Sequence, residues 1–191
     1  MATTLPWDLP LYRIRRKVLK IFGASFHVYD GDKVVAFCKQ KAFKLREDIR
    51  LFTDESMATE LLWIRARQII DFAACYDIVD SASQKKVGSL RRRGFASLVR
   101  DSWEVMDLDD KVIGKVEEDG MGMALLRRFL SNLIPQTFHL SGGAGGKVTL
   151  KQRFNPFVYS LEVTVPVDCS FDKRLVFGAA VLIAAIEGRQ E

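Results

Sequence analysis

The sequence predicts a mainly β (α+β) domain in which roughly ten to twelve antiparallel strands close around one hydrophobic C-terminal helix. Short runs of alternating apolar and polar residues with turn signals between them predict the strands. One wholly apolar segment near the C-terminus predicts the helix. With 191 residues, 48% hydrophobic and 28% charged, the chain can bury a large core, which excludes collagen-like, low-complexity and disordered proteins.

A repeated hairpin phrase carries most of the strand prediction. Residues 26–37 alternate apolar and polar side chains around Asp30-Gly31, a strong signal for a tight hairpin turn. The phrase recurs at residues 76–88 and 103–114, and more weakly at 49–55. The equivalent positions Val28, Leu51, Ile78 and Val105 are 23, 27 and 27 residues apart, which indicates a repeated supersecondary unit whose aspartates form turns.

Further alternating runs supply the remaining strands. They occupy residues 12–18, 62–67, 147–151 and 163–165, with Arg and Lys on the faces expected to meet solvent. A sheet with this many strands is expected to close or fold upon itself, because closure removes exposed edges. Gly142–Gly146 is expected to be a flexible turn between two of these strands.

Two helices are expected. Leu175–Ile186 contains twelve consecutive residues without a charge, too few for a membrane span, which needs about 20. Because it is apolar on every face, we expect it to be surrounded by the protein; insertion of the chain end into a membrane and an oligomer interface are the alternatives. Met121–Ile134 has apolar residues at helical spacing and predicts one additional amphipathic helix that ends at Pro135.

The chain is expected to be one domain in a reducing compartment. Residues 1–10 form an N-terminal extension, and residues 11–191 form a single barrel domain with its central helix at about 172–187. The three cysteines are widely spaced and suggest neither disulfides nor a zinc site. The N-terminus has no basic segment followed by an apolar stretch, so a cytoplasmic protein is expected.

This combination of strands and helix resembles the tubby C-terminal-like superfamily, which includes phospholipid scramblases and LURP-one-related proteins. The resemblance is carried by residues 12–18, by residues 26–36, by the later copy that begins at Trp103, and by the apolar C-terminal helix. It implies a twelve-stranded barrel around a central helix. It also implies phosphoinositide binding, calcium-dependent lipid scrambling or a role not yet known, although no scramblase-type calcium loop is matched here.

Basic charge is segregated along the chain. Residues 9–29, 81–100 and 121–161 contain no acidic residue and carry +5, +6 and +5, whereas the net charge of the whole protein is only +5. The remaining residues therefore carry −11. Such segregation is typical of a protein that meets an anionic surface, provided that the three segments lie together in the fold.

These segments contain the predicted binding residues for lipid or phosphate. We expect the centre of the site at three consecutive arginines beside two lysines, with three further cations contributed by the first strand. The residues are Arg91, Arg92, Arg93, Lys85, Lys86, Arg13, Arg15 and Lys17. A patch of four or five cations suffices for reversible membrane docking at about 1 kcal/mol each. The same side chains are also compatible with solvated strand faces or with nucleic-acid phosphates.

No catalytic pattern is present in the sequence. His27 and His139 lie on alternating strands with no nucleophile nearby in sequence, and the acidic clusters near residues 107–119 lack the spacing of a calcium loop. No cofactor or metal is expected. The predicted function is a non-catalytic module that binds anionic phospholipid headgroups, including phosphoinositides, as a peripheral membrane protein. A structural or protein-interaction domain is the alternative, and nucleic-acid binding and small-molecule catalysis are less favoured.

Overall fold

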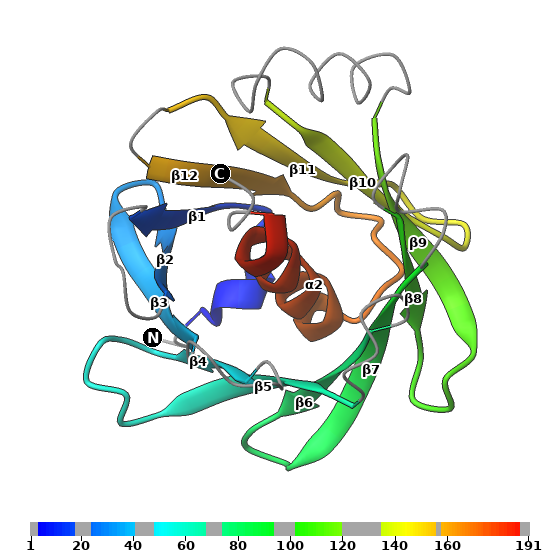
Figure 1. The fold of residues 1–191 in the computed structure, drawn as a ribbon, viewed down its shortest axis with the longest axis horizontal. Helices are drawn as coiled ribbons and strands as arrows, with labels where there is room; N and C mark the ends of the chain where they lie inside the picture. The colour runs from blue at the N-terminus through cyan, green and yellow to red at the C-terminus, as the bar shows by residue number, and fades with distance from the viewer. Residues whose placement is uncertain are drawn as a thin grey trace.

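The computed structural model describes residues 4–17, 24–40, 48–67, 74–93, 102–119, 135–155 and 158–187. These residues form a short 3-10 helix, twelve strands and one α-helix (Figure 1). The elements are η1 (Pro6–Asp8), β1 (Leu11–Lys17), β2 (Ala24–Asp30), β3 (Lys33–Gln40), β4 (Asp48–Phe52), β5 (Glu60–Ala66), β6 (Cys75–Asp80), β7 (Lys85–Arg92), β8 (Ser102–Met106), β9 (Val112–Glu118), β10 (Thr137–Ser141), β11 (Val148–Arg153), β12 (Val158–Thr164) and α2 (Lys173–Glu187).

The strands form one closed antiparallel barrel, as the sequence predicts. Each strand pairs with its neighbours in the chain, and β1 pairs with β12 to close the ring. This closing pair runs from Leu11 opposite Thr164 to Lys17 opposite Val158. In Figure 1 the first strand, in dark blue, therefore lies beside β12, in orange. No strand of this ring is left with an open edge, which removes a common site of aggregation.

The hairpin repeat is confirmed as a structural repeat with a common irregularity. Val28, Leu51, Ile78 and Val105 lie on β2, β4, β6 and β8 and are all fully buried. The pairing register shifts directly after each of them, as at a β-bulge. A bulge bends a strand and increases its twist, so four bulges at equivalent positions help to curve the sheet toward closure.

The predicted C-terminal helix is confirmed as α2, and its apolar side chains are buried. The side chains of residues 175–185 are at most 2% exposed wherever they are apolar. Figure 1 shows α2, in red, within the ring of strands. Phe177 packs on Tyr12 of β1 with 5.2 Å between ring centroids, and on Trp7 of η1 at 6.2 Å. In the described residues, no helix is long and apolar enough to cross a membrane.

The start of α2 is fixed by an acid–base cluster. Asp172 accepts a hydrogen bond from the backbone N–H of Arg174 at 2.8 Å, in the manner of a helix cap. The Arg174 guanidinium pairs with Asp172 at 2.7 Å and with Asp80, at the end of β6, also at 2.7 Å. These contacts tie the first turn of the helix to one end of the barrel.

The glycine-rich loop forms the expected turn and packs closely against neighbouring backbone. A Cβ atom on Gly145 would lie 2.4 Å from the backbone oxygen of Asp168, in the segment that leads into α2. A Cβ atom on Gly142 would lie 2.3 Å from the backbone oxygen of Ile113. Side chains at these two positions would collide with the neighbouring backbone, which explains the glycines.

The two other expectations concern residues 121–134 and the N-terminal extension at residues 1–10. The amphipathic helix expected at Met121–Ile134 lies outside the described residues. Within the expected N-terminal extension, Pro6 is buried and Asp8 pairs with Lys173 at 3.1 Å, so this segment contacts the start of α2.

Substituting Gly88 by Ala tests the packing of α2 against the barrel wall. The added Cβ would lie 2.7 Å from the backbone oxygen of Met106 and 2.9 Å from both methyl groups of Leu175. We expect the free energy of unfolding to fall by about 1–3 kcal/mol in denaturant titrations. The control is Gly31→Asn at a positive φ of 57° with open space around it, which should cost less than about 1 kcal/mol. Equal stability of the Gly88→Ala variant and the wild type would contradict this packing.

Substituting Arg174 by Met tests the cluster at the helix start. Hydrogen bonds from Arg174 lower the pKa of Asp172, and the Ser83 backbone together with Arg174 lowers the pKa of Asp80. Because these folded-state pKa values lie below those of the unfolded chain, the stabilisation is complete at neutral pH and is lost as the pH falls below about 4. We expect Arg174→Met to lose about 1 kcal/mol of stability at pH 7, with a smaller loss in acid. Lys173→Met, which removes a more exposed pair, is the control; a loss in Arg174→Met that does not change with pH would contradict the assignment.

Candidate functional site

Ring closure brings two of the three basic segments together on one outer wall. β1, β12 and β11 are consecutive in the ring. Tyr12 and Ile14 of β1 are buried in the core. Because side chains alternate along a strand, the intervening Arg13 and the following Arg15 lie on the outside of the barrel. On β11, Lys151 and Arg153 are exposed in the same way. Glu162 of β12 is the one acidic residue in these three strands.

A hollow of about 340 Å³ lies on this wall, and we call it the arginine hollow. It is lined by Arg13, Arg15, Arg153, Phe154, Asn155, Val158, Ser160 and Glu162. Strand register explains why three arginines meet there. Arg15 lies opposite Ser160 on β12, which in turn lies opposite Arg153 on β11. Arg13 lies one alternation further along, opposite Glu162.

The arginine hollow has an excess of positive charge. Its single carboxylate, Glu162, is engaged by Arg153, whose Nη2 lies 2.7 Å from Oε1. Arg15 places its guanidinium 5.5 Å from the centre of the Tyr29 ring. In the described part of the chain, no carboxylate pairs with Arg13 or Arg15. The lining therefore has two more cations than anions, and two guanidinium groups keep their donors available to a ligand.

The predicted centre at Arg91, Arg92 and Arg93 has a different environment. Arg91 donates to Oε2 of Glu104 at 2.9 and 2.6 Å, and Arg93 lies 3.6 Å from the other oxygen of the same carboxylate. Arg92, one residue out of phase, places its guanidinium over the ring of buried Trp103 at 5.7 Å. Three consecutive arginines in a strand therefore do not present one cationic surface.

The structure separates the other predicted residues as well. Lys85 and Lys86 begin β7, roughly 20 Å along the strand from Arg92. Lys86 is engaged by Asp110 at 2.6 Å. β1 lies six places from β7 in either direction around the ring, so Arg13 and Arg15 are on the opposite wall. Lys17 ends β1, and its side chain lies outside the described residues.

On the wall formed by β5, β6 and β7, the positive charges are balanced by carboxylates. Arg67 donates to buried Asp77 at 2.7 Å and to both oxygens of Asp110 at 2.9 and 2.6 Å. Hydrogen bonds from Arg67, then from Lys86, hold the pKa of Asp110 far below its ordinary value. Asp107 forms the expected turn, because its Oδ1 accepts the backbone N–H groups of Asp109 and Lys111. The cations on this wall are matched by carboxylates.

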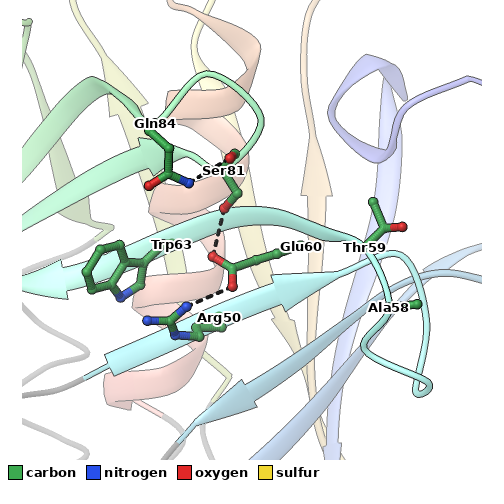
Figure 2. A pocket seen from close by; sticks show the side chains of 7 residues that line it. All are labelled: Arg50, Ala58, Thr59, Glu60, Trp63, Ser81 and Gln84. Carbon is green, nitrogen blue, oxygen red and sulfur yellow. Dashed lines mark hydrogen bonds and ion pairs between the residues drawn. The ribbon is translucent and has the colours of Figure 1, made fainter.

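A second, larger hollow of about 480 Å³ lies outside β4 and β5 (Figure 2). Figure 2 shows Arg50 and Ser81 both directed at Glu60. Each donates a hydrogen bond of 2.8 Å to a carboxylate oxygen of Glu60. Arg50 also lies 3.2 Å from Asp48 and stacks 4.6 Å from the Trp63 ring centre. Since Arg50 already has two carboxylate partners, this hollow offers little attraction to an anion.

In the described residues, neither histidine forms a hydrogen bond with a cysteine or serine side chain, although His139 lies between a carboxylate and a threonine hydroxyl. His27 lies 2.5 Å from Glu55, and His139 lies 2.8 Å from Asp119. Thr149 lies 3.4 Å from the other ring nitrogen of His139. In the same residues, no three His, Cys, Asp or Glu side chains gather as metal ligands. Phosphate binding by arginine is the chemistry best supported by these surfaces.

The predicted binding residues include Arg13 and Arg15 but neither Arg153 nor Phe154, which line the same hollow. Arg153 was visible as a cation in a segment without acids, and Phe154 follows it directly. The pairing of β1 with β12 brings these residues together. It joins residues about 150 positions apart, so local sequence patterns do not predict it.

Comparison with known proteins agrees with this architecture. The family model described as LURP-one-related matches residues 34–183, from the start of β3 into α2. The match includes Arg153 and Glu162, whereas Arg13 and Arg15 precede it. A search of curated proteins found no match. Because the family model covers most of the chain, and the barrel agrees with it, the protein belongs to the LURP-one-related family, within the tubby-like superfamily.

Proposed function

We propose that this protein is a non-catalytic module that binds anionic phospholipid headgroups, including those of phosphoinositides, in the arginine hollow. The observation that carries the proposal is the charge imbalance there: Arg13 and Arg15 have no carboxylate partner in the described residues, and the hollow has a volume of about 340 Å³. Guanidinium groups match phosphate oxygens with paired hydrogen bonds, so arginine is well suited to this ligand.

The barrel architecture favours a site on the outer surface. We propose that α2 stays in the barrel and fills it, since the apolar side chains of residues 175–185 are at most 2% exposed. A ligand site inside the barrel would require the helix to leave. The hollows lined by charged side chains lie on the outer walls, at β1–β12–β11 and at β4–β5.

Family membership supports the same proposal. Some members of the tubby-like superfamily bind phosphoinositides, and the family match includes β11 and β12 of the arginine hollow, whereas β1 precedes it. We therefore propose a cytoplasmic protein that associates with membranes peripherally and reversibly. Each cation near an anionic bilayer contributes about 1 kcal/mol, so a few arginines give binding that responds to salt.

The double variant Arg13→Gln/Arg15→Gln tests the arginine hollow. Both side chains lack a carboxylate partner in the described structure, so their removal leaves no acid unpaired there. We expect binding to phosphoinositide-containing vesicles at about 0.15 M salt to weaken about 30-fold, from the loss of about 2 kcal/mol. The measurement is vesicle co-sedimentation, with neutral and phosphatidylserine-containing vesicles in parallel and duplex DNA as a competitor.

The matched control is Lys85→Gln/Arg91→Gln, on the opposite wall. It lowers the net charge from +5 by the same two units, so it separates the arginine hollow from a general effect of charge. An equal loss in both variants would contradict a localised site. Indifference of the wild type to every vesicle would contradict lipid binding and favour a protein-interaction domain, and efficient competition by DNA would favour nucleic acid.

A further inference from the structure

An exposed aromatic side chain lies at the edge of the arginine hollow. Phe154 follows the last residue of β11 and is 57% exposed. Among the described residues, it is the one aromatic side chain in the set of exposed large apolar residues. Phe154 lines the same hollow as Arg13, Arg15 and Arg153. The site therefore combines excess positive charge with an apolar group in direct contact with water.

The position of Phe154 is set by its neighbours on both sides. Arg153 before it is held in the sheet opposite Ser160, and its guanidinium pairs with Glu162. Asn155 after it accepts a hydrogen bond from the backbone N–H of Val158 at 3.1 Å, which draws the start of β12 toward the end of β11. Phe154 therefore lies one residue, roughly 3 Å, beyond the row formed by Arg15, Ser160 and Arg153.

This pairing of groups distinguishes a bilayer from a soluble phosphate. Cations alone are sufficient to hold a free phosphate ester, and an exposed ring beside them contributes little. A lipid headgroup at a bilayer surface presents phosphate and, about 5–10 Å away, the apolar boundary of the acyl chains. Aromatic side chains are favoured at this boundary. A hollow that holds phosphate with an aromatic ring at its edge matches that arrangement.

We propose that Phe154 inserts into the interfacial layer of an anionic bilayer while the arginine hollow holds the headgroup phosphate. The corner of the barrel between β11 and β12 then faces the membrane. This inference rests on the proposed lipid binding and adds the apolar contact, the orientation and the bilayer itself as the partner. It involves no change in the position of α2.

Phe154→Ala separates the apolar contact from headgroup binding. We expect the affinity for phosphoinositide-containing vesicles to fall about tenfold, since burial of a phenylalanine side chain in an apolar layer supplies a factor of that order. The affinity for soluble inositol trisphosphate should stay within about twofold of the wild type, because the arginines are unchanged. Leu108→Ala is the matched control: Leu108 is 60% exposed, follows β8 and lies away from the arginine hollow, so neither affinity should change.

Insertion can also be measured directly by introducing a tryptophan. Phe154→Trp and Leu108→Trp are compared in vesicles whose acyl chains carry bromine, which quenches tryptophan fluorescence on contact. We expect additional quenching for Phe154→Trp only, above the background from the three native tryptophans. Melting temperatures equal to that of the wild type would establish that each variant is folded.

The outcomes distinguish this inference from the proposed function. Loss of vesicle binding in Arg13→Gln/Arg15→Gln, with no effect of Phe154→Ala and no added quenching, would overturn insertion and keep headgroup binding. An equal loss of vesicle and inositol trisphosphate binding in Phe154→Ala would also overturn insertion, because the ring would then contact the headgroup itself. If the wild type bound a protein partner and no vesicle, and these substitutions weakened that binding, both proposals would be overturned.

Discussion

The pairing of β1 with β12 is the contact on which the rest of the structure depends. Seven residue pairs, from Leu11 and Thr164 to Lys17 and Val158, convert an open twelve-stranded sheet into a closed ring. Without them, two strands would expose their backbone groups, and the face of α2 that packs on Tyr12 would lose its cover. The same pairing brings Arg13 and Arg15 beside Arg153. Core and candidate site therefore have one common origin, although they lie on opposite faces of the strands.

The ring closes because curvature is repeated in the sequence. The four buried residues that precede register shifts lie at the same place in successive hairpins of the first two-thirds of the chain. Each bulge adds bend and twist in the same sense. Glycines then allow the wall and the helix to approach: Gly88 lies against Leu175, and Gly178 lies against Ile78. A helix without a polar stripe is compatible with this environment, since apolar side chains surround it.

Local patterns predicted most of the fold, because strand alternation, hairpin turns and an apolar helix are properties of neighbouring residues. The closed antiparallel barrel, the repeat and the C-terminal helix all followed from them. The site was harder to predict for two physical reasons. Charge counted along the chain ignores alternation, so Arg92 was grouped with Arg91 although it lies over Trp103. Counting charge along the chain also ignores partners on adjacent strands. Glu104 lies opposite Arg91, whereas no carboxylate lies opposite Arg15 in the described residues.

Charge compensation, and not charge density, distinguishes the arginine hollow from the other basic surfaces. Arg50, Arg67 and Arg91 are no less basic than Arg13, yet each donates to at least one carboxylate within 3 Å. A ligand phosphate at those positions would have to displace an anion that is already held in place. At the arginine hollow, the phosphate would instead be a new anionic partner. Arg13 and Arg15 pair with no carboxylate in the described residues, so they would gain this partner without breaking an ion pair there. The surface selected by this criterion also carries Phe154, a feature that charge alone does not explain. In the described residues, the coincidence of cations that have no carboxylate partner with an exposed ring is the basis for the proposal that the β11–β12 corner faces a membrane.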